Sequence, residues 1–187
     1  MNRLLLLAAL FLCSLFTYAN LTGSGTKDDP YMIYDADDLN EVRDYVGVVN
    51  IYFQLANDID LSTYSNGLGW EPIGTSGAQF KGVFDGNGHT IYNLKINRTT
   101  DYVGLFGYNS GIIKSVCIEC VIKGKSYVGG VTGYSSSTIS NCYVKGSIIA
   151  SSYCGGIVGY VYNSTISNCY FNGNIVSSSN YCGGIIG

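Results

Sequence analysis

The residues best suited to chemistry in this chain are three acids, Asp58, Asp60 and Asp85. Asp58 and Asp60 are two positions apart in NDID, so both side chains would leave the same face of an extended strand. Paired carboxylates on one face can act as acid and base in the cleavage of a polysaccharide. Acids in NDID and DGNG also solvate turns and strand edges. Both interpretations stay open at this point, and we favour the second.

Other catalytic and metal-binding arrangements lack residues that they need. Zinc peptidase chemistry requires two His one helical turn apart with a Glu between them, and the chain has a single His, His89. A Ser-His-Asp or Cys-His arrangement would have to centre on His89, which directly follows the turn sequence DGNG and is interpreted as a surface residue. No calcium-loop spacing is present. The sequence predicts no catalytic set, no metal and no cofactor.

Composition restricts the class of protein. Of 187 residues, 47% are hydrophobic and 12% are charged, with 25 Gly, 17 Tyr and a formal net charge of −3. So few charges argue against a disordered or long-helical chain, and the lack of Lys and Arg clusters argues against nucleic-acid binding. A single small domain, rich in strands and turns, is what remains.

Residues 1–19 have the pattern of a cleaved secretory signal peptide. Arg3 precedes an apolar run from Leu4 to Phe16, and small residues follow at Thr17 and Ala19. The run is too short to cross a bilayer comfortably, and no later segment is long and apolar enough for a membrane span. We therefore expect a secreted or cell-surface protein.

Residues 102–187 consist of copies of one segment. Tyr102, Tyr127, Tyr153 and Tyr181 begin the copies, at intervals of 25, 26 and 28 residues, and the fourth copy is truncated after YCGGIIG. Within the copies apolar and polar residues alternate, as in strands with one buried face. A unit this short cannot bury that face alone, whereas copies stacked about 4.8 Å apart align their apolar positions into one core. The predicted fold is all-β, a parallel β-helix.

Alignment of the copies predicts the direction of individual side chains. Two inward-facing stacks are expected, formed by Val116, Cys142 and Cys169, and by Ile118, Val144 and Phe171. The glycine pairs Gly129–Gly130 and Gly155–Gly156 should supply the positive backbone angles or the close approach that corners need. The leading tyrosines, and a second set at Tyr108, Tyr134 and Tyr160, should form ladders that stabilise the stack or bind sugars or proteins.

The chain before the copies has a different pattern. Residues 20–50 should form an N-terminal cap with a helix at about 36–46, capped by Asp35 and ended by Gly47. Such a helix would cover the open end of the solenoid.

Residues 51–101 are expected to form the first coils of the β-helix. In IYFQLANDIDL, apolar residues occupy odd-numbered positions, which predicts a first strand with one buried face. These residues are Ile51, Phe53, Leu55, Ile59 and Leu61. The sequence DGNG predicts a tight turn before a strand from Ile91 to Ile96.

Six cysteines remain after removal of residues 1–19, an even number that is compatible with disulfides in an exported chain. Cys142 and Cys169 are one coil apart, as are Cys154 and Cys182. In-register parallel neighbours point their Cβ atoms the same way, which disfavours the torsion of a disulfide. We favour free buried thiols, and a disulfide remains the alternative for each pair. We expect Cys117 to be the most exposed thiol.

Charge is concentrated before the last copies. From Gly146 onward there is no Asp, Glu, Lys or Arg, and no capping helix follows the fourth copy. We expect the chain to be the N-terminal part of a longer protein and to self-associate through its uncapped C-terminal end.

The copies YVGLFGY, YVGGVTGY and YCGGIVGY, each followed by IIKSV or TISNC, resemble the GLUG motif. This motif occurs in secreted bacterial and some eukaryotic surface proteins, including the non-catalytic region of immunoglobulin A peptidase-like proteins. The upstream FQLANDIDLS, WEPIGT and FKGVFDGNGHTIYNL are similar to the leader that precedes such repeats. The resemblance covers about Gly23 to Gly187. It implies a right-handed β-helix on a surface-exposed or adhesin-like protein, and it carries no catalytic residues.

These observations favour a non-enzymatic, secreted or surface-displayed β-solenoid that acts as a stalk, adhesion or binding module. Host or microbial glycans or surface proteins are the expected partners. The alternative is the N-terminal part of a carbohydrate-active β-helix enzyme that uses Asp58, Asp60 or Asp85.

Overall fold

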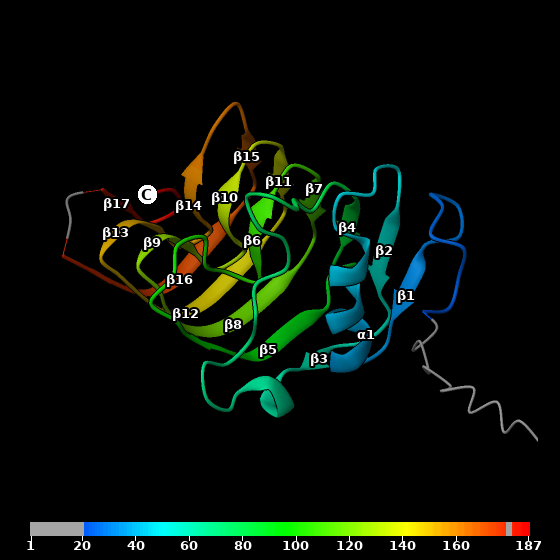
Figure 1. Ribbon diagram of the computed structural model, residues 1–187, viewed down its shortest axis with the longest axis horizontal. Helices are drawn as coiled ribbons and strands as arrows, with labels where there is room; N and C mark the ends of the chain where they lie inside the picture. The colour runs from blue at the N-terminus through cyan, green and yellow to red at the C-terminus, as the bar shows by residue number, and fades with distance from the viewer. Residues whose placement is uncertain (1–20, 179–180) are drawn as a thin grey trace, which may run out of the picture.

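Parallel strands dominate the computed structural model, which describes residues 21–178 and 181–187 (Figure 1). The signal peptide expected at residues 1–19 lies outside the described residues. Within the described part, no helix has the length and apolar character needed to cross a membrane.

Two larger sheets form two walls of a β-solenoid. One sheet has the order β1-β2-β4-β7-β11-β15 and is formed by β1 (Tyr31–Ile33), β2 (Tyr52–Leu55), β4 (Val83–Asp85), β7 (Ile112–Lys114), β11 (Thr138–Ser140) and β15 (Thr165–Ser167). The other has the order β16-β12-β8-β5-β3 and is formed by β3 (Ile59–Asp60), β5 (Thr90–Asn97), β8 (Cys117–Lys123), β12 (Tyr143–Ala150) and β16 (Tyr170–Ser177).

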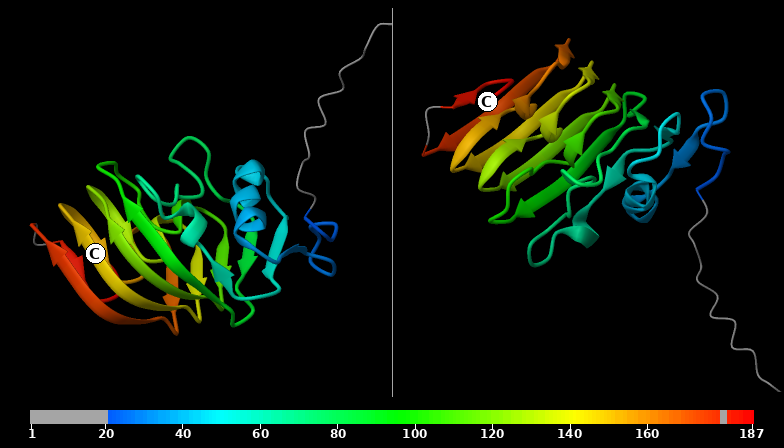
Figure 2. Two further views of the ribbon diagram at one scale, coloured as in Figure 1. Left: turned by 90° about the horizontal axis from the view of Figure 1, so that it is seen from below. Right: turned by 45° about the horizontal axis from the view of Figure 1, so that its top comes forward.

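Two smaller sheets complete the coils. They are formed by β6 (Phe106–Asn109), β10 (Thr132–Ser135) and β14 (Val158–Val161), and by β9 (Ser126–Gly129), β13 (Ser152–Gly155) and β17 (Cys182–Gly183). All pairings between the strands of the four sheets are parallel. Figure 2 shows the coils stacked one behind another. The predicted all-β solenoid is confirmed.

The register between coils places like residues in columns. Val144 lies opposite Ile118 of β8 and Phe171 of β16. Val144 and Ile118 have no exposed surface, while Phe171 in the last full coil is half-buried. Val116 and Cys142 are buried as well, and Cys169 is half-buried. The two inward stacks are therefore confirmed, and with them the phase of the repeated strands.

The parity of the apolar residues predicts one strand from Ile51 to Leu61, and this prediction is wrong. The segment is divided into β2 and β3, which belong to different sheets and meet at a corner. Phe53, Leu55 and Ile59 are nevertheless all buried. The reason is that both walls of a solenoid face one interior. Odd-numbered side chains can therefore point into the core on both sides of a corner, although the strand itself is interrupted there.

Corners use the paired glycines for close approach and not for positive φ. A Cβ on Gly130 would lie 2.5 Å from Cγ1 of Val144, and a Cβ on Gly156 would lie 2.2 Å from Cγ of Phe171. The left-handed backbone angles occur instead at the leading tyrosines, with φ of 60°, 56° and 47° at Tyr102, Tyr127 and Tyr153. Bulky residues rarely adopt this region, so each of these corners is strained.

The N-terminal segment contains the one α-helix of the described residues, α1 (Ala36–Glu41), followed by the 3-10 helix η1 (Val42–Tyr45). Asp35 Oδ1 accepts hydrogen bonds from the backbone N–H groups of Asp37 and Asp38, which caps α1. Leu39 and Val42 are buried in the core. Figure 2 shows the helix beside β1 at the N-terminal end of the stack.

Burial of Val144 leads to a stability prediction. Val144→Asp should place an unpaired carboxylate in the core and lower the free energy of unfolding by about 3 kcal/mol or more. Urea denaturation followed by circular dichroism measures the change. The matched control is Ile149→Asp on the same strand, where the side chain is 38% exposed and the effect should stay within about 1 kcal/mol. Equal losses in the two variants would contradict the assigned strand phase.

Candidate functional site

Asp58 links two neighbouring coils through hydrogen bonds. Its Oδ1 accepts one from the backbone N–H of Thr90 at 2.8 Å and lies 3.2 Å from Nδ1 of His89. The bond from Thr90, followed by the bond from His89, lowers the pKa of the Asp58 carboxyl. Asp58 is therefore ionised at neutral pH and has no proton to donate as a general acid.

Asp60 and Asp85 are held by separate partners. Oδ1 of Asp60 accepts hydrogen bonds from Nδ2 of Asn93 at 2.8 Å and from the backbone N–H of Ser62 at 2.9 Å, and these bonds lower its pKa. Asp85 accepts a hydrogen bond from the backbone N–H of Asn87 in its own turn and pairs with Lys114. In the described hydrogen bonds the three acids share no partner. Each of them makes contacts within a turn or between coils.

The surroundings of His89 do not activate a cysteine. Cys117 lies opposite Thr90 in the register of β5 and β8, close to the pair formed by Asp58 and His89. Burial, together with the charge of Asp58, raises the pKa of the Cys117 thiol. A cysteine nucleophile needs the opposite shift, because the thiolate is the reactive form. The described residues also contain no cluster of three or more His, Cys, Asp or Glu that could hold a metal ion.

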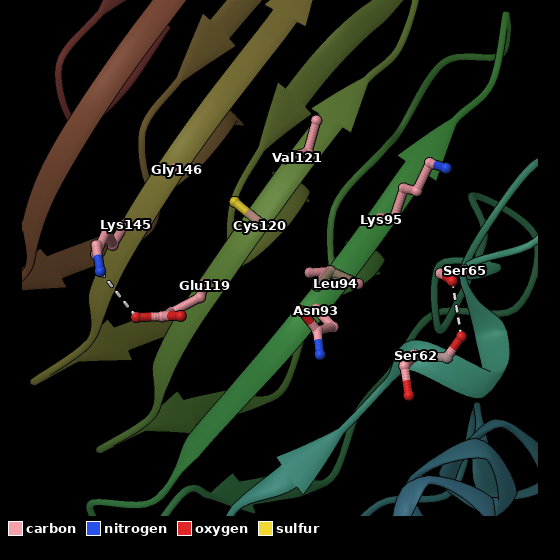
Figure 3. Close-up of a pocket in the computed structure, with 10 residues that line it drawn as sticks. All are labelled: Ser62, Ser65, Asn93, Leu94, Lys95, Glu119, Cys120, Val121, Lys145 and Gly146. Atoms are coloured by element: carbon pink, nitrogen blue, oxygen red, sulfur yellow. Dashed lines mark hydrogen bonds and ion pairs between the residues drawn. The ribbon is translucent and has the colours of Figure 1, made fainter.

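A groove of about 600 Å³ crosses the outer face of β5, β8 and β12 (Figure 3). The 3-10 helix η2 (Ser62–Tyr64) borders it on one side, and Lys145 of β12 borders it on the other. Between them the groove presents both polar and apolar side chains, from Ser65, Asn93, Lys95, Glu119 and Val121. The alternation of the strands predicts outward directions for Glu119, Val121 and Lys145. It gives no indication of the loop with Ser62 and Ser65, so sequence reasoning missed the groove.

One cysteine pair differs from the expectation. Cys154 and Cys182 form a disulfide, with their Cα atoms 4.7 Å apart. Free thiols were the wrong interpretation for this pair, since in-register spacing lies inside the range that a disulfide spans. The strand β17 has two residues and ends the stack, so little pairing opposes the local adjustment. Cys142 and Cys169 remain free thiols, as do Cys117 and Cys120.

Two columns of tyrosines run along the solenoid. Ring centroids in the column of Tyr102, Tyr127, Tyr153 and Tyr181 are 5.1, 5.1 and 4.7 Å apart, and the rings are stacked. The second column, formed by Tyr108, Tyr134 and Tyr160, has spacings of 4.2 and 5.5 Å. Edge contacts such as Tyr127 to Tyr160, at 5.7 Å, join the columns. The predicted tyrosine ladders are therefore confirmed, and their rings contact one another both along and between the two columns.

Two segments match a known family. Residues 124–149 and 150–176 match the model described as the GLUG motif, and they correspond to the copies that begin at Tyr127 and Tyr153. The chain thus carries GLUG motifs, and in this structure each motif contributes to the stacked coils of the solenoid.

Two relatives share about half of this chain. A protein named as a Gly-rich membrane protein from Evansella cellulosilytica is 44% identical over 101 residues, which are 51% of this chain and 12% of that protein. Halomucin from Haloquadratum walsbyi is 37% identical over 109 residues, which are 52% of this chain and 1% of that protein. The chain therefore corresponds to a small part of the length of either relative.

Among solved structures, the chain is similar to a protein assigned as an immunoglobulin A1 protease from Bacteroides ovatus. The similarity has a TM-score of 0.49 and 21% sequence identity, and it covers 87% of this chain and 72% of that one.

Cys169 is expected to be the most reactive thiol of the described residues. The neighbouring side chain of Cys142 lowers the pKa of Cys169 to about 7, whereas burial raises the pKa of Cys120 to about 12. Alkylation by iodoacetamide at pH 7, read by peptide mass spectrometry, should modify Cys169 before Cys117. The rate should rise with pH through about 7, because the thiolate fraction rises there.

The variant Cys142→Ala provides the control for this prediction. It removes the neighbouring side chain that lowers the pKa of Cys169, so that pKa should rise and alkylation of Cys169 at pH 7 should slow. If Cys169 reacted equally fast in both proteins, the proposed cause of its reactivity would be wrong.

Proposed function

We propose that this chain is a surface-displayed β-solenoid module that serves as a stalk and binding surface in a longer, non-catalytic protein. The observation that supports it most is the in-register stack, in which β8 and β12 each pair along nearly their whole length with the coils on both sides. Such a stack is a stiff rod that gains about 4.8 Å with each coil, as a stalk requires.

Display outside the cell is supported by two further observations. Residues 1–19 have the pattern of a secretory signal. A relative that is 44% identical over its matched region is named as a membrane protein. We infer that the chain is secreted or held at the cell surface, with its solenoid exposed to the surroundings.

The runner-up function is that of a carbohydrate-active β-helix enzyme. Glycoside hydrolysis by two carboxyl groups needs one of them protonated at the working pH. Hydrogen bonds lower the pKa of both Asp58 and Asp60, and Asp85 is paired with Lys114. These contacts count against a general acid among the three candidates, so we favour binding without cleavage.

A panel of host and microbial glycans separates the two functions. The chain should retain one or more glycans and release no product from them, and Asp58→Ala should leave retention unchanged. Binding is read by glycan array and product release by reducing-end assay. Product release that disappears in Asp58→Ala would overturn the proposal in favour of the enzyme. Protease accessibility on intact cells that produce the natural protein tests display.

Self-association through the C-terminal coil stays a prediction. Phe171 and Ile175 of β16 are half-buried, and they line a hollow together with Cys182 and Gly183 of the two-residue strand β17. The polypeptide that ends at Gly187 should therefore form oligomers at tens of micromolar, detected by light scattering. A clean monomer would contradict this prediction without affecting the proposed stalk.

A further inference from the structure

We propose that the groove over β5, β8 and β12 binds a carboxylated glycan, with the sugar ring over Val121 and its carboxylate at Lys95. This inference rests on the proposed binding function and names its site and ligand class. Val121 is 58% exposed although it is apolar. In the register of the sheet it lies between Lys95 of β5 and Ser147 of β12.

Val121 forms an apolar spot inside a polar rim. Along its own strand, the outward neighbours at two residues' distance are Glu119 and Lys123, both exposed. Such an arrangement suits a sugar, because a pyranose ring presents an apolar C–H face and a rim of hydroxyl groups. Small-ligand sites of about 300–1,000 Å³ commonly combine an apolar surface with a few placed polar groups.

The hollow exists because the chain departs from its repeat on one side of the face. The helix η2 follows β3 and brings Ser62 and Ser65 to the border of the groove. A register shift between Ile91 and Leu94 interrupts β5 next to it, and Asn93, with φ of 59°, is exposed there. The border is therefore rich in groups that hydrogen-bond hydroxyls.

On the opposite side, Gly146 of β12 lines the groove and packs closely against the backbone of β8. A Cβ at Gly146 would lie 1.9 Å from the backbone oxygen of Cys120, so this position admits no side chain. The floor of the groove at this point is backbone, and Lys145 beside it is exposed at the edge.

Charge on this face favours an anion. The strands β5, β8, β12 and β16 carry three lysines, Lys95, Lys123 and Lys145, and one acid, Glu119, in a chain with a net charge of −3. Nζ of Lys145 lies 3.1 Å from Oε1 of Glu119 and neutralises it. Lys95 is exposed and has no ion pair or side-chain hydrogen bond among the described interactions.

A second acid, Asp60, lies beside the groove and limits where the anion can lie. Asp60 stands on β3, beyond Asn93, and its carboxylate accepts hydrogen bonds from Asn93 and Ser62. A second carboxylate beside it would be repelled. The carboxylate of the ligand therefore belongs on the side of Lys95, with uncharged hydroxyl groups toward Ser62 and Asn93.

Other polymer classes fit this face less well. A peptide that adds a strand needs an unpaired sheet edge, whereas β5, β8 and β12 are paired on both sides. A single-stranded nucleic acid needs aromatic rings for base stacking, and none lines the groove. A sugar polymer needs neither feature.

Calorimetry with two probes that differ only in charge tests the proposal. We expect the chain to bind a short oligogalacturonate, and we expect its methyl ester, which has the same sugars without charge, to bind at least about tenfold more weakly. Binding of the acid should weaken as salt rises, since Lys95 remains accessible to solvent.

Two variants and two matched controls locate the site. Lys95→Gln should weaken binding of the oligogalacturonate about tenfold, and Val121→Asp should abolish it. Lys81→Gln removes the same charge from an exposed lysine outside the groove, and Val48→Asp makes the same change at a residue that is 44% exposed and outside the groove. Both controls should bind as the unchanged chain does. Thermal melting checks that all four variants fold.

The outcomes distinguish this proposal from the proposed function. Equal binding of the acid and the ester, or equal losses in Lys95→Gln and Lys81→Gln, would overturn the groove as a carboxylate site. If the chain failed to bind oligogalacturonate and other uronate polymers but bound neutral glycans on the array, the ligand class would be wrong and the binding module would stand. If the chain bound no glycan at all, both the carboxylate site in the groove and the proposed binding function would be wrong.

Discussion

Parallel, in-register pairing of successive coils is the constraint on which the rest of this structure depends. Each coil satisfies its backbone hydrogen bonds with the coil before it and the coil after it, so a residue type at one position is repeated above and below. Ile118, Val144 and Phe171 form one such column inside the solenoid. Asn141 and Asn168 form another at a corner, where Nδ2 of Asn168 donates to Oδ1 of Asn141 at 3.1 Å and both residues have positive φ.

The tyrosine columns show how a repeated corner can tolerate strain. A left-handed backbone at a residue other than Gly costs roughly 1–2 kcal/mol, and three leading tyrosines adopt it. Aromatic pairs contribute about 0.5–1.5 kcal/mol each beyond burial, and every one of these rings has a stacked neighbour. The two effects are of similar size, so stacking offsets the corner strain only because the coils are repeated.

The candidate site lies where the repetition is interrupted. The acids that looked catalytic belong to the regular architecture, because Asp58 and Asp60 each join one coil to the next through Thr90 and Asn93. The groove instead arises where η2 and the irregular register of β5 leave the outer face uneven. In this chain the interior column of Ile118, Val144 and Phe171 stays apolar from coil to coil, whereas the outer face differs between coils.

The sequence by itself determined the solenoid and its phase. Alternation with a period of two assigns a face to each residue, and a repeat of 25 to 28 residues requires neighbours to share that assignment, which is why Val144 and Ile118 could be placed in the core. Only the tertiary structure decided three matters. It divided residues 51–61 between two sheets, joined Cys154 to Cys182, and brought Ser62 and Ser65 to the border of the groove that Lys95 also lines. Each of these depends on the path of the chain at corners and in loops. Hydrophobic periodicity does not predict that path, because it assigns a side chain to the interior in the same way before and after a corner.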